Sequence, residues 1–329
     1  MSVITRIGNE AIAEKDDFPL HAAAATGDVK TITSLITDGG HCPDGVNRSG
    51  ATPLILASCE KRLLAMRALL ANGADPNHLG LLHVAASCEY TDQMSLLLQY
   101  GADINRSLDG WTPLHYAAQE SQDGALLYLV ERGANLSICD MEGQSVLHRA
   151  ASNCWGAAST LEIIIKQGVS PNLSDFHGKT ALHCAAESCS QPEPFITLIA
   201  HGANINQRDA RLRTPLYCAA SHSRISVINT LAMRGADLTL ANIYGETPLE
   251  RAVRRNDVSV VKALVGAMMQ QDQQMFLSIG LLLQPFGFPV LVVYEICCAA
   301  RRSPAQQQQV YVLPRAKAWQ MLSKVKHTC

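Results

Sequence analysis

Length, composition and charge describe a chain that can bury a sizeable core and carries almost no net charge. Of 329 residues, 47% are hydrophobic and only 17% are charged, which leaves room for one large domain or two ordinary ones. The 27 lysines and arginines oppose 29 aspartates and glutamates, and this near-balance argues against a general nucleic-acid binder, which needs a basic excess. Eleven scattered cysteines indicate reduced thiols in a chain of this length. With no apolar signal-like stretch at the start, we expect a soluble cytoplasmic protein, with the nucleus as the alternative.

One local pattern recurs along most of the chain, and it centres on a leucine that in most copies precedes a glycine by 19 residues. These leucines stand 28 to 35 residues apart, at Leu20, Leu54, Leu82, Leu114, Leu147, Leu182, Leu216 and Leu249. Such a period indicates stacked repeats, because a single unit cannot bury its own apolar face. We expect a repeat domain over residues 18–266, an N-terminal segment 1–17, and a C-terminal tail 267–329 that is apolar and then basic.

Each repeat is predicted to contain two helices and a projecting turn. In the fullest copy, Thr112 followed by proline suits a helix N-cap and first helical position. Leu114 and Ala117 then lie on one apolar face. A second apolar helix follows and ends at Gly133, a residue that readily adopts the left-handed conformation. The next stretch, 135–143, contains Asn, Asp and Gly and favours a turn.

This pattern resembles the ankyrin repeat, through TPLH-like elements such as residues 112–115 and GA(D/N)-type endings such as residues 133–135. The resemblance covers residues 18–266, about three quarters of the chain. It implies an all-α solenoid of about eight repeats, with helix–turn–helix units, hairpin fingers and a short C-terminal extension, that binds another protein and has no active site. It also makes one set of histidines structural, tying neighbouring turns together: His21, His83, His115, His148 and His183.

Residues outside the repeat consensus are expected to set partner specificity on the concave surface that this fold implies. The candidates at variable finger or inner-helix positions are Leu108, Trp111, Tyr116, Met141, Arg149, Phe176, Tyr217 and Tyr244. The alternative is that several of them merely pack between fingers. Trp155, in a lengthened turn between two helices, is a further candidate anchor, although covering the repeat edge is the favoured interpretation.

Arginines gather near the last two repeats and form a candidate basic corner for an acidic segment of a partner. They are Arg208, Arg211, Arg213, Arg251, Arg254 and Arg255. The favoured alternative is that they keep the capping repeat soluble.

Two departures concern chemistry and finger length. The finger from Gly73 to Leu82 is shorter than the others, so we expect it to be clipped. Residues 178–180 match the last three residues of a phosphate-binding loop, but Leu173 stands where that motif requires its first glycine. Without a CxxC pair either, we expect no catalytic residues, cofactor or metal.

One modification is implied by the resemblance alone. In many ankyrin proteins an intracellular asparaginyl hydroxylase modifies a finger asparagine, and Asn105 and Asn206 match that position. Each has a leucine eight positions earlier, Leu97 and Leu198.

The tail leaves three alternatives open. The uncharged run 275–294 is long enough to span a membrane, but Pro285 and Pro289 split it. The preferred alternative is a pair of short helices that shield the last repeat. The third is a resemblance to the SOCS box, which recruits elongins and a cullin to form a ubiquitin ligase.

The SOCS-box resemblance rests on Cys297 followed by arginines and on Leu313-Pro314. It departs from that motif four residues on either side of Cys297, where Val293 and Arg301 replace a leucine and an apolar residue. The main hypothesis is therefore an adaptor or scaffold with a protein partner of unknown identity. A ligase substrate receptor is the alternative, and a membrane-tethered adaptor is the third.

Overall fold

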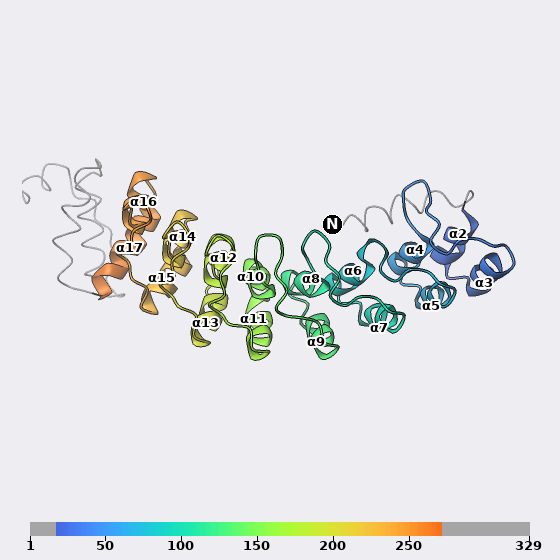
Figure 1. The fold of residues 1–329 in the computed structure, drawn as a ribbon. Helices are drawn as coiled ribbons and strands as arrows, with labels where there is room; N and C mark the ends of the chain where they lie inside the picture. Colours follow the sequence, from blue (N-terminus) through green and yellow to red (C-terminus); the bar gives the residue numbers. More distant parts are fainter. Residues whose placement is uncertain (1–17, 272–329) are drawn as a thin grey trace, which may run out of the picture. The chain divides into compact units, whose positions relative to one another are not determined.

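The computed structural model describes residues 18–271, and these contain 16 α-helices, one short 3-10 helix and no β-strand (Figure 1). The chain divides into two compact units, Met1–His177 and Gly178–Cys329. Consecutive helices pair within each unit, and most pairs are joined to the next by a projecting loop, the finger (Figure 1). The predicted all-α repeat fold is therefore confirmed.

The first unit holds five helix pairs. They are α2 (Pro19–Thr26) with α3 (Val29–Thr37), α4 (Pro53–Cys59) with α5 (Leu63–Ala71), α6 (Leu81–Ser87) with α7 (Thr91–Gln99), α8 (Pro113–Gln119) with α9 (Asp123–Glu131), and α10 (Val146–Ser152) with α11 (Ala157–Lys166). The first helix of a pair also packs on that of its neighbour, α2 on α4, α6 on α8 and α8 on α10. Neighbouring repeats thus complete each other's core.

The second unit holds three helix pairs. They are α12 (Ala181–Ser188) with α13 (Glu193–Ala200), α14 (Pro215–Ser221) with α15 (Ile225–Met233), and α16 (Pro248–Arg254) with α17 (Val258–Gln271). Within it α14 packs between α12 and α16. The repeat boundary predicted at residue 266 falls inside α17, which continues through Gly266 to Gln271.

Local sequence explains the helix starts. Thr112 precedes Pro113 in the extended conformation and forms a capping box with His115. The Nδ1 atom of His115 accepts from the Thr112 hydroxyl at 2.9 Å, and its Nε2 donates to the Gln144 carbonyl of the next finger at 3.3 Å. One imidazole therefore caps its own helix and ties it to the neighbouring repeat.

Of the other predicted core histidines, His148 and His183 also cap their own helices, whereas His21 and His83 do not. All five are buried. Nε2 of His21 bonds the Ala51 carbonyl, that of His83 the Arg106 carbonyl, and that of His183 the Arg213 carbonyl, at 2.8 to 3.0 Å. His148 contacts the Ser145 hydroxyl through Nδ1 at 2.8 Å. Burial lowers the pKa of His115 to about 4, so the imidazole is neutral at neutral pH.

Fingers are folded by a side chain that caps their own backbone. The Asp140 carboxylate accepts the N–H groups of Glu142 and Gln144, both at 2.9 Å. Asp209 and Asn242 accept the corresponding N–H groups two and four residues on. These Asx turns point finger side chains in a fixed direction.

The clipped finger is confirmed between the second and third repeats. In place of a hairpin, the 3-10 helix η1 (His78–Gly80) leads directly into α6. Nearby, a buried pair joins the two repeats: the Ser58 hydroxyl donates to the Gln93 side chain at 2.8 Å, and the Gln93 amide donates to the Ser58 carbonyl at 3.0 Å.

Candidate partner-binding surface

Aromatic side chains meet in the first unit where the finger before α8 joins that helix. The rings of Trp111 and Tyr116 lie edge to face with centroids 5.2 Å apart, and Tyr116 contacts His83 of the preceding repeat at 5.5 Å. Trp111 and Tyr116 are both half-buried. This geometry leaves part of each ring available to a partner while neighbouring repeats hold it in place.

Arg149, on α10, closes the other side of Trp111. Its guanidinium lies 4.0 Å from the centre of an indole ring, within the range of a cation–π interaction. Two of its nitrogens contact the Asp140 carboxylate, with the Nε–Oδ2 distance at 2.9 Å. Burial alone would raise the pKa of Asp140, but Arg149 and the two finger N–H groups lower it overall. The guanidinium is therefore fixed over the indole.

Two predicted finger residues carry large apolar side chains into solvent. Met141 is 73% exposed and Phe176 is 77% exposed. Each lies against a glycine of the preceding finger: a Cβ built on Gly110 would come 2.9 Å from Met141 Cγ, and one on Gly143 would come 2.6 Å from the Phe176 ring. Both side chains contact a neighbouring finger and still expose most of their surface.

Leu108 illustrates the alternative of packing between fingers. Its backbone pairs with Trp111 through two hydrogen bonds of 2.8 and 2.9 Å. Its side chain fills the place above Gly80, where a Cβ would come 2.1 Å from Leu108 Cδ1. Leu108 therefore stabilises the finger by packing and contributes little surface for a partner.

Tyr217 corrects the expectation of a variable surface residue. It occupies the position that histidine holds in five other repeats, directly after the repeat leucine, and it is only 4% exposed. Its hydroxyl donates to the Glu246 carboxylate at 2.7 Å and accepts from the Asn242 amide at 2.9 Å. Tyr217 therefore replaces the histidine tie to the next finger, while Tyr244 on that finger is 81% exposed.

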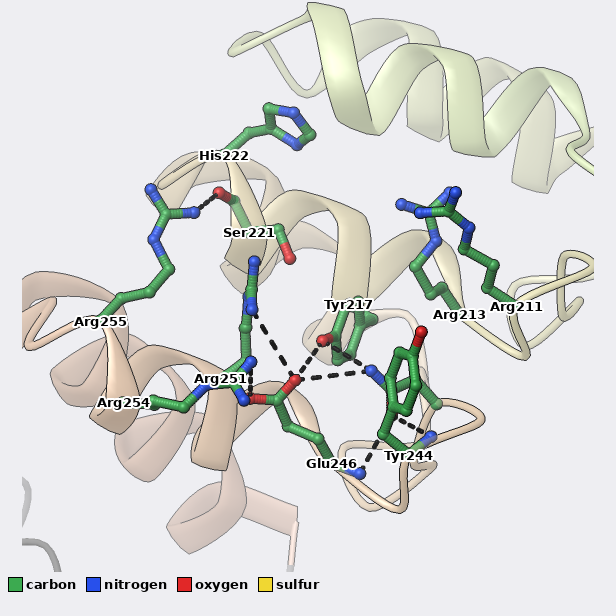
Figure 2. A pocket seen from close by; sticks show the side chains of 11 residues that line it. Arg211, Arg213, Tyr217, Ser221, His222, Tyr244, Glu246, Arg251, Arg254 and Arg255 are labelled. Carbon is green, nitrogen blue, oxygen red and sulfur yellow. Dashed lines mark hydrogen bonds and ion pairs between the residues drawn. The ribbon is translucent and has the colours of Figure 1, made fainter.

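Five of the six predicted arginines line a pocket of about 280 Å³ in the second unit: Arg211, Arg213, Arg251, Arg254 and Arg255. Figure 2 shows Arg211 and Arg213 on one side of Tyr217 and the three arginines of the last repeat on the other. Arg208 does not line it, because its guanidinium turns back to donate to the Leu212 and Ala241 carbonyls.

Glu246 lies at the centre of this pocket (Figure 2). Its carboxylate accepts from Tyr217, forms an ion pair with Arg254 at 2.7 Å and lies 3.9 Å from Arg251. Burial, and then the hydrogen bond to Glu246, raise the pKa of Tyr217 to about 12. An aspartate or asparagine three residues before a finger glycine was the available signal for Asp140 and Asn242, but not for Asp209, which precedes Leu212. The role of Glu246 had no such signal.

The remaining candidates lie apart from both surfaces. Trp155 is 76% exposed, so it covers little of the repeat edge, contrary to the favoured interpretation. The side-chain oxygen of Asn105 accepts the Asn135 N–H, and that of Asn206 accepts the Asp237 N–H, each at 2.8 Å. Their hydroxylation stays a prediction.

Residues 18–271 contain no group of three metal-ligating side chains that could hold a metal ion. In the same range, no helix has the length and apolar character needed to cross a membrane. The tail alternatives at 275–294 and around Cys297 lie outside the described residues.

The repeated helix pairs, capping histidines and fingers define an ankyrin-repeat protein. The family model described as "Ankyrin repeats (3 copies)" matches residues 4–80, 78–140, 135–209 and 195–274, and the chain belongs to this family. Ankyrin repeats are typically interaction modules without enzymatic activity, so protein–protein interaction is the class of function.

Individual relatives share the repeats. The chain is 28% identical over 261 residues to dog (Canis lupus familiaris) inversin, covering 75% of this chain and 21% of inversin. It is 30% identical over 263 residues to human B-cell lymphoma 3 protein, covering 76% and 50% of the two chains. The crystal structure of the human ASB11 ankyrin repeat domain matches with a TM-score of 0.56 and 25% identity, over 67% of this chain and 99% of that one. The chain thus spans at most about half of these two curated relatives.

Proposed function

We propose that this protein is an adaptor that binds a partner through the aromatic face, defined as Trp111, Tyr116, Met141, Arg149 and Phe176. All five lie in the first unit, on fingers and first helices. The observation that carries the proposal is the pairing of a fixed Trp–Arg–Asp contact with two finger-tip side chains that are more than 70% exposed. Apolar and arginine side chains held in advance are typical of interface hot spots, because little side-chain entropy is lost on binding.

The test compares captured partners between matched variants. The full chain, the finger-tip variant Met141→Ser with Phe176→Ser, and a control with Leu64→Ser and Met233→Ser are used as baits in cell lysate. The control removes exposed apolar side chains from second helices. We expect quantitative mass spectrometry to show partners depleted from the finger-tip variant and retained by the control. Equal recovery with all three baits would refute the aromatic face as the binding surface.

The ligase alternative depends on residues beyond the repeats. A fourth bait that ends after residue 274 keeps α17 whole. Elongins and a cullin captured by the full chain and lost with this truncation would favour a substrate receptor. If neither bait captures elongins or a cullin, the result would favour the plain adaptor. Both baits keep the aromatic face, so each can still bind a partner there.

A further inference from the structure

The pocket in the second unit places five arginines against one glutamate. Arginines gathered in one place repel one another, so such a cluster needs an opposing charge, either from the protein or from a bound ligand. The five arginines come from two separate segments of the chain. Arg211 and Arg213 precede α14, and the other three belong to α16 and its C-cap. Folding, and not one run of sequence, brings them together.

Three of the five arginines form short contacts, and Arg251 forms a longer ion pair with Glu246 at 3.9 Å. Arg213 forms an ion pair with Asp209 at 2.7 Å, and Arg254 forms one with Glu246 at 2.7 Å. Arg255 donates to the Ser221 carbonyl. These contacts hold the walls of the pocket in place.

Arg211 and Arg251 retain donors. Arg211 is exposed, and its guanidinium forms no ion pair with any residue in the range 18–271. The Nε atom of Arg251 is buried and lacks a hydrogen-bond partner in that range, and the Nη1 atom lies 3.9 Å from the Glu246 carboxylate. A buried donor without an acceptor is costly, and an arginine present only for solubility would not turn this donor inward.

We propose that this pocket binds carboxylate side chains from an acidic segment of a partner protein, with Arg211 and Arg251 as the main ligands. The guanidinium fork matches a carboxylate in geometry and charge. Tyr244, exposed at the rim, offers an aromatic wall for the methylene groups of an acidic residue. The net charge of −2 disfavours a continuous phosphate backbone, whose binding needs a basic excess.

The test measures fluorescence anisotropy of a short fluorescein-labelled oligoglutamate peptide with the full chain at low salt. The pocket variant is Arg211→Gln with Arg251→Gln. The control is Arg208→Gln with Arg234→Gln, which removes the same two charges from the same unit but outside the pocket. We expect about a tenfold or greater rise in Kd for the pocket variant, as loss of charge-assisted hydrogen bonds produces, and less than about a twofold change for the control.

Each contrary result overturns the proposal. No saturable peptide binding by the wild-type chain would do so, as would equal weakening in the two double variants, which would show only the effect of overall charge. Displacement of the peptide by oligothymidylate at concentrations where free oligoglutamate fails would identify a nucleic-acid site instead. If Arg251→Gln prevents folding, Arg211→Glu alone reverses an exposed charge and is expected to abolish binding. Every substitution in this test lies in the second unit, whereas the aromatic face lies in the first. A negative result would therefore overturn the acidic-segment proposal without bearing on the aromatic face.

Discussion

The guanidinium of Arg149 lies 4.0 Å from the centre of a Trp111 ring while it pairs with the Asp140 carboxylate. Trp111 and Arg149 belong to successive repeats, so the contact joins a finger and its neighbour across the repeat boundary. Stacking on Trp111, ion pairing with Asp140 and the capping of the finger backbone by Asp140 thus all stabilise the same arrangement. The aromatic face is built before any partner arrives.

Removing this arginine should destabilise the fold more than removing a similar one on the surface. Arg149→Met leaves Asp140 buried without its charged partner, and we expect the free energy of unfolding to fall by about 1–3 kcal/mol. Arg132→Met, which removes an arginine lying 4.8 Å over Tyr128, is the control and should cost less than about 1 kcal/mol. Urea denaturation of both variants measures the difference. Equal costs would mean that the Asp140 contact adds nothing.

The neutral histidines predict a loss of stability in mild acid. The pKa of His115 is about 4 in the folded chain and about 6.5 when unfolded, so the unfolded state binds the proton more readily. The stability contributed by neutral His115 is complete above pH 6.5 and is lost as pH falls toward 4, at about 1.4 kcal/mol for each unit of pKa separation.

His115→Gln should therefore show a shallower decline in unfolding free energy between pH 6.5 and 4 than the wild-type chain. His177→Gln, which changes an exposed histidine, is the matched control. Denaturant titrations at several pH values provide the comparison. Parallel curves for the wild-type chain and His115→Gln would contradict the assignment.

Tyr217→Phe should destabilise the second unit. The substitution removes the hydroxyl that donates to Glu246 and accepts from Asn242. Removing one hydrogen bond from a half-buried carboxylate costs about 1–3 kcal/mol. Tyr244→Phe changes an exposed hydroxyl and should stay within about 0.5 kcal/mol of wild type. A result in which Tyr244→Phe costs as much as Tyr217→Phe would count against the tie.

Thiol reactivity should separate buried from exposed cysteines. Burial raises the pKa of Cys218 to about 12, and the thiolate is the reactive form. Cys42 is exposed. With iodoacetamide at neutral pH, peptide mass spectrometry should find Cys42 labelled in the native protein and Cys218 labelled only after denaturant is added. Labelling of both at one rate would show that α14 opens readily.

Hydroxylation of Asn105 and Asn206 is tested in cells that contain the asparaginyl hydroxylase. Peptide mass spectrometry should find the addition of one oxygen at either residue. Both side chains join successive fingers, so a modified fraction would lie at a repeat-to-repeat contact. Unmodified peptides at both positions would remove this prediction.

Local sequence determined the repeats. Thr112-Pro113 begins a helix, Gly133 with φ +88° follows the end of another, and His115 caps its own helix. These features depend on residues a few positions apart, so spacing alone could reveal them. The same local rules indicated which positions lie on fingers, and with them Met141 and Phe176.

Tertiary structure decided which of those positions cooperate. Sequence spacing did not distinguish Arg208, which bonds backbone carbonyls, from Arg211, which enters the pocket. Nor did it show that Tyr217 is buried against Glu246, or that Arg149 selects the ring of Trp111. The contacts of a long side chain depend on its rotamer and on which groups of the neighbouring repeat lie within its reach. That choice is made between residues about 30 or more positions apart, where only the stacked repeats bring their atoms into contact.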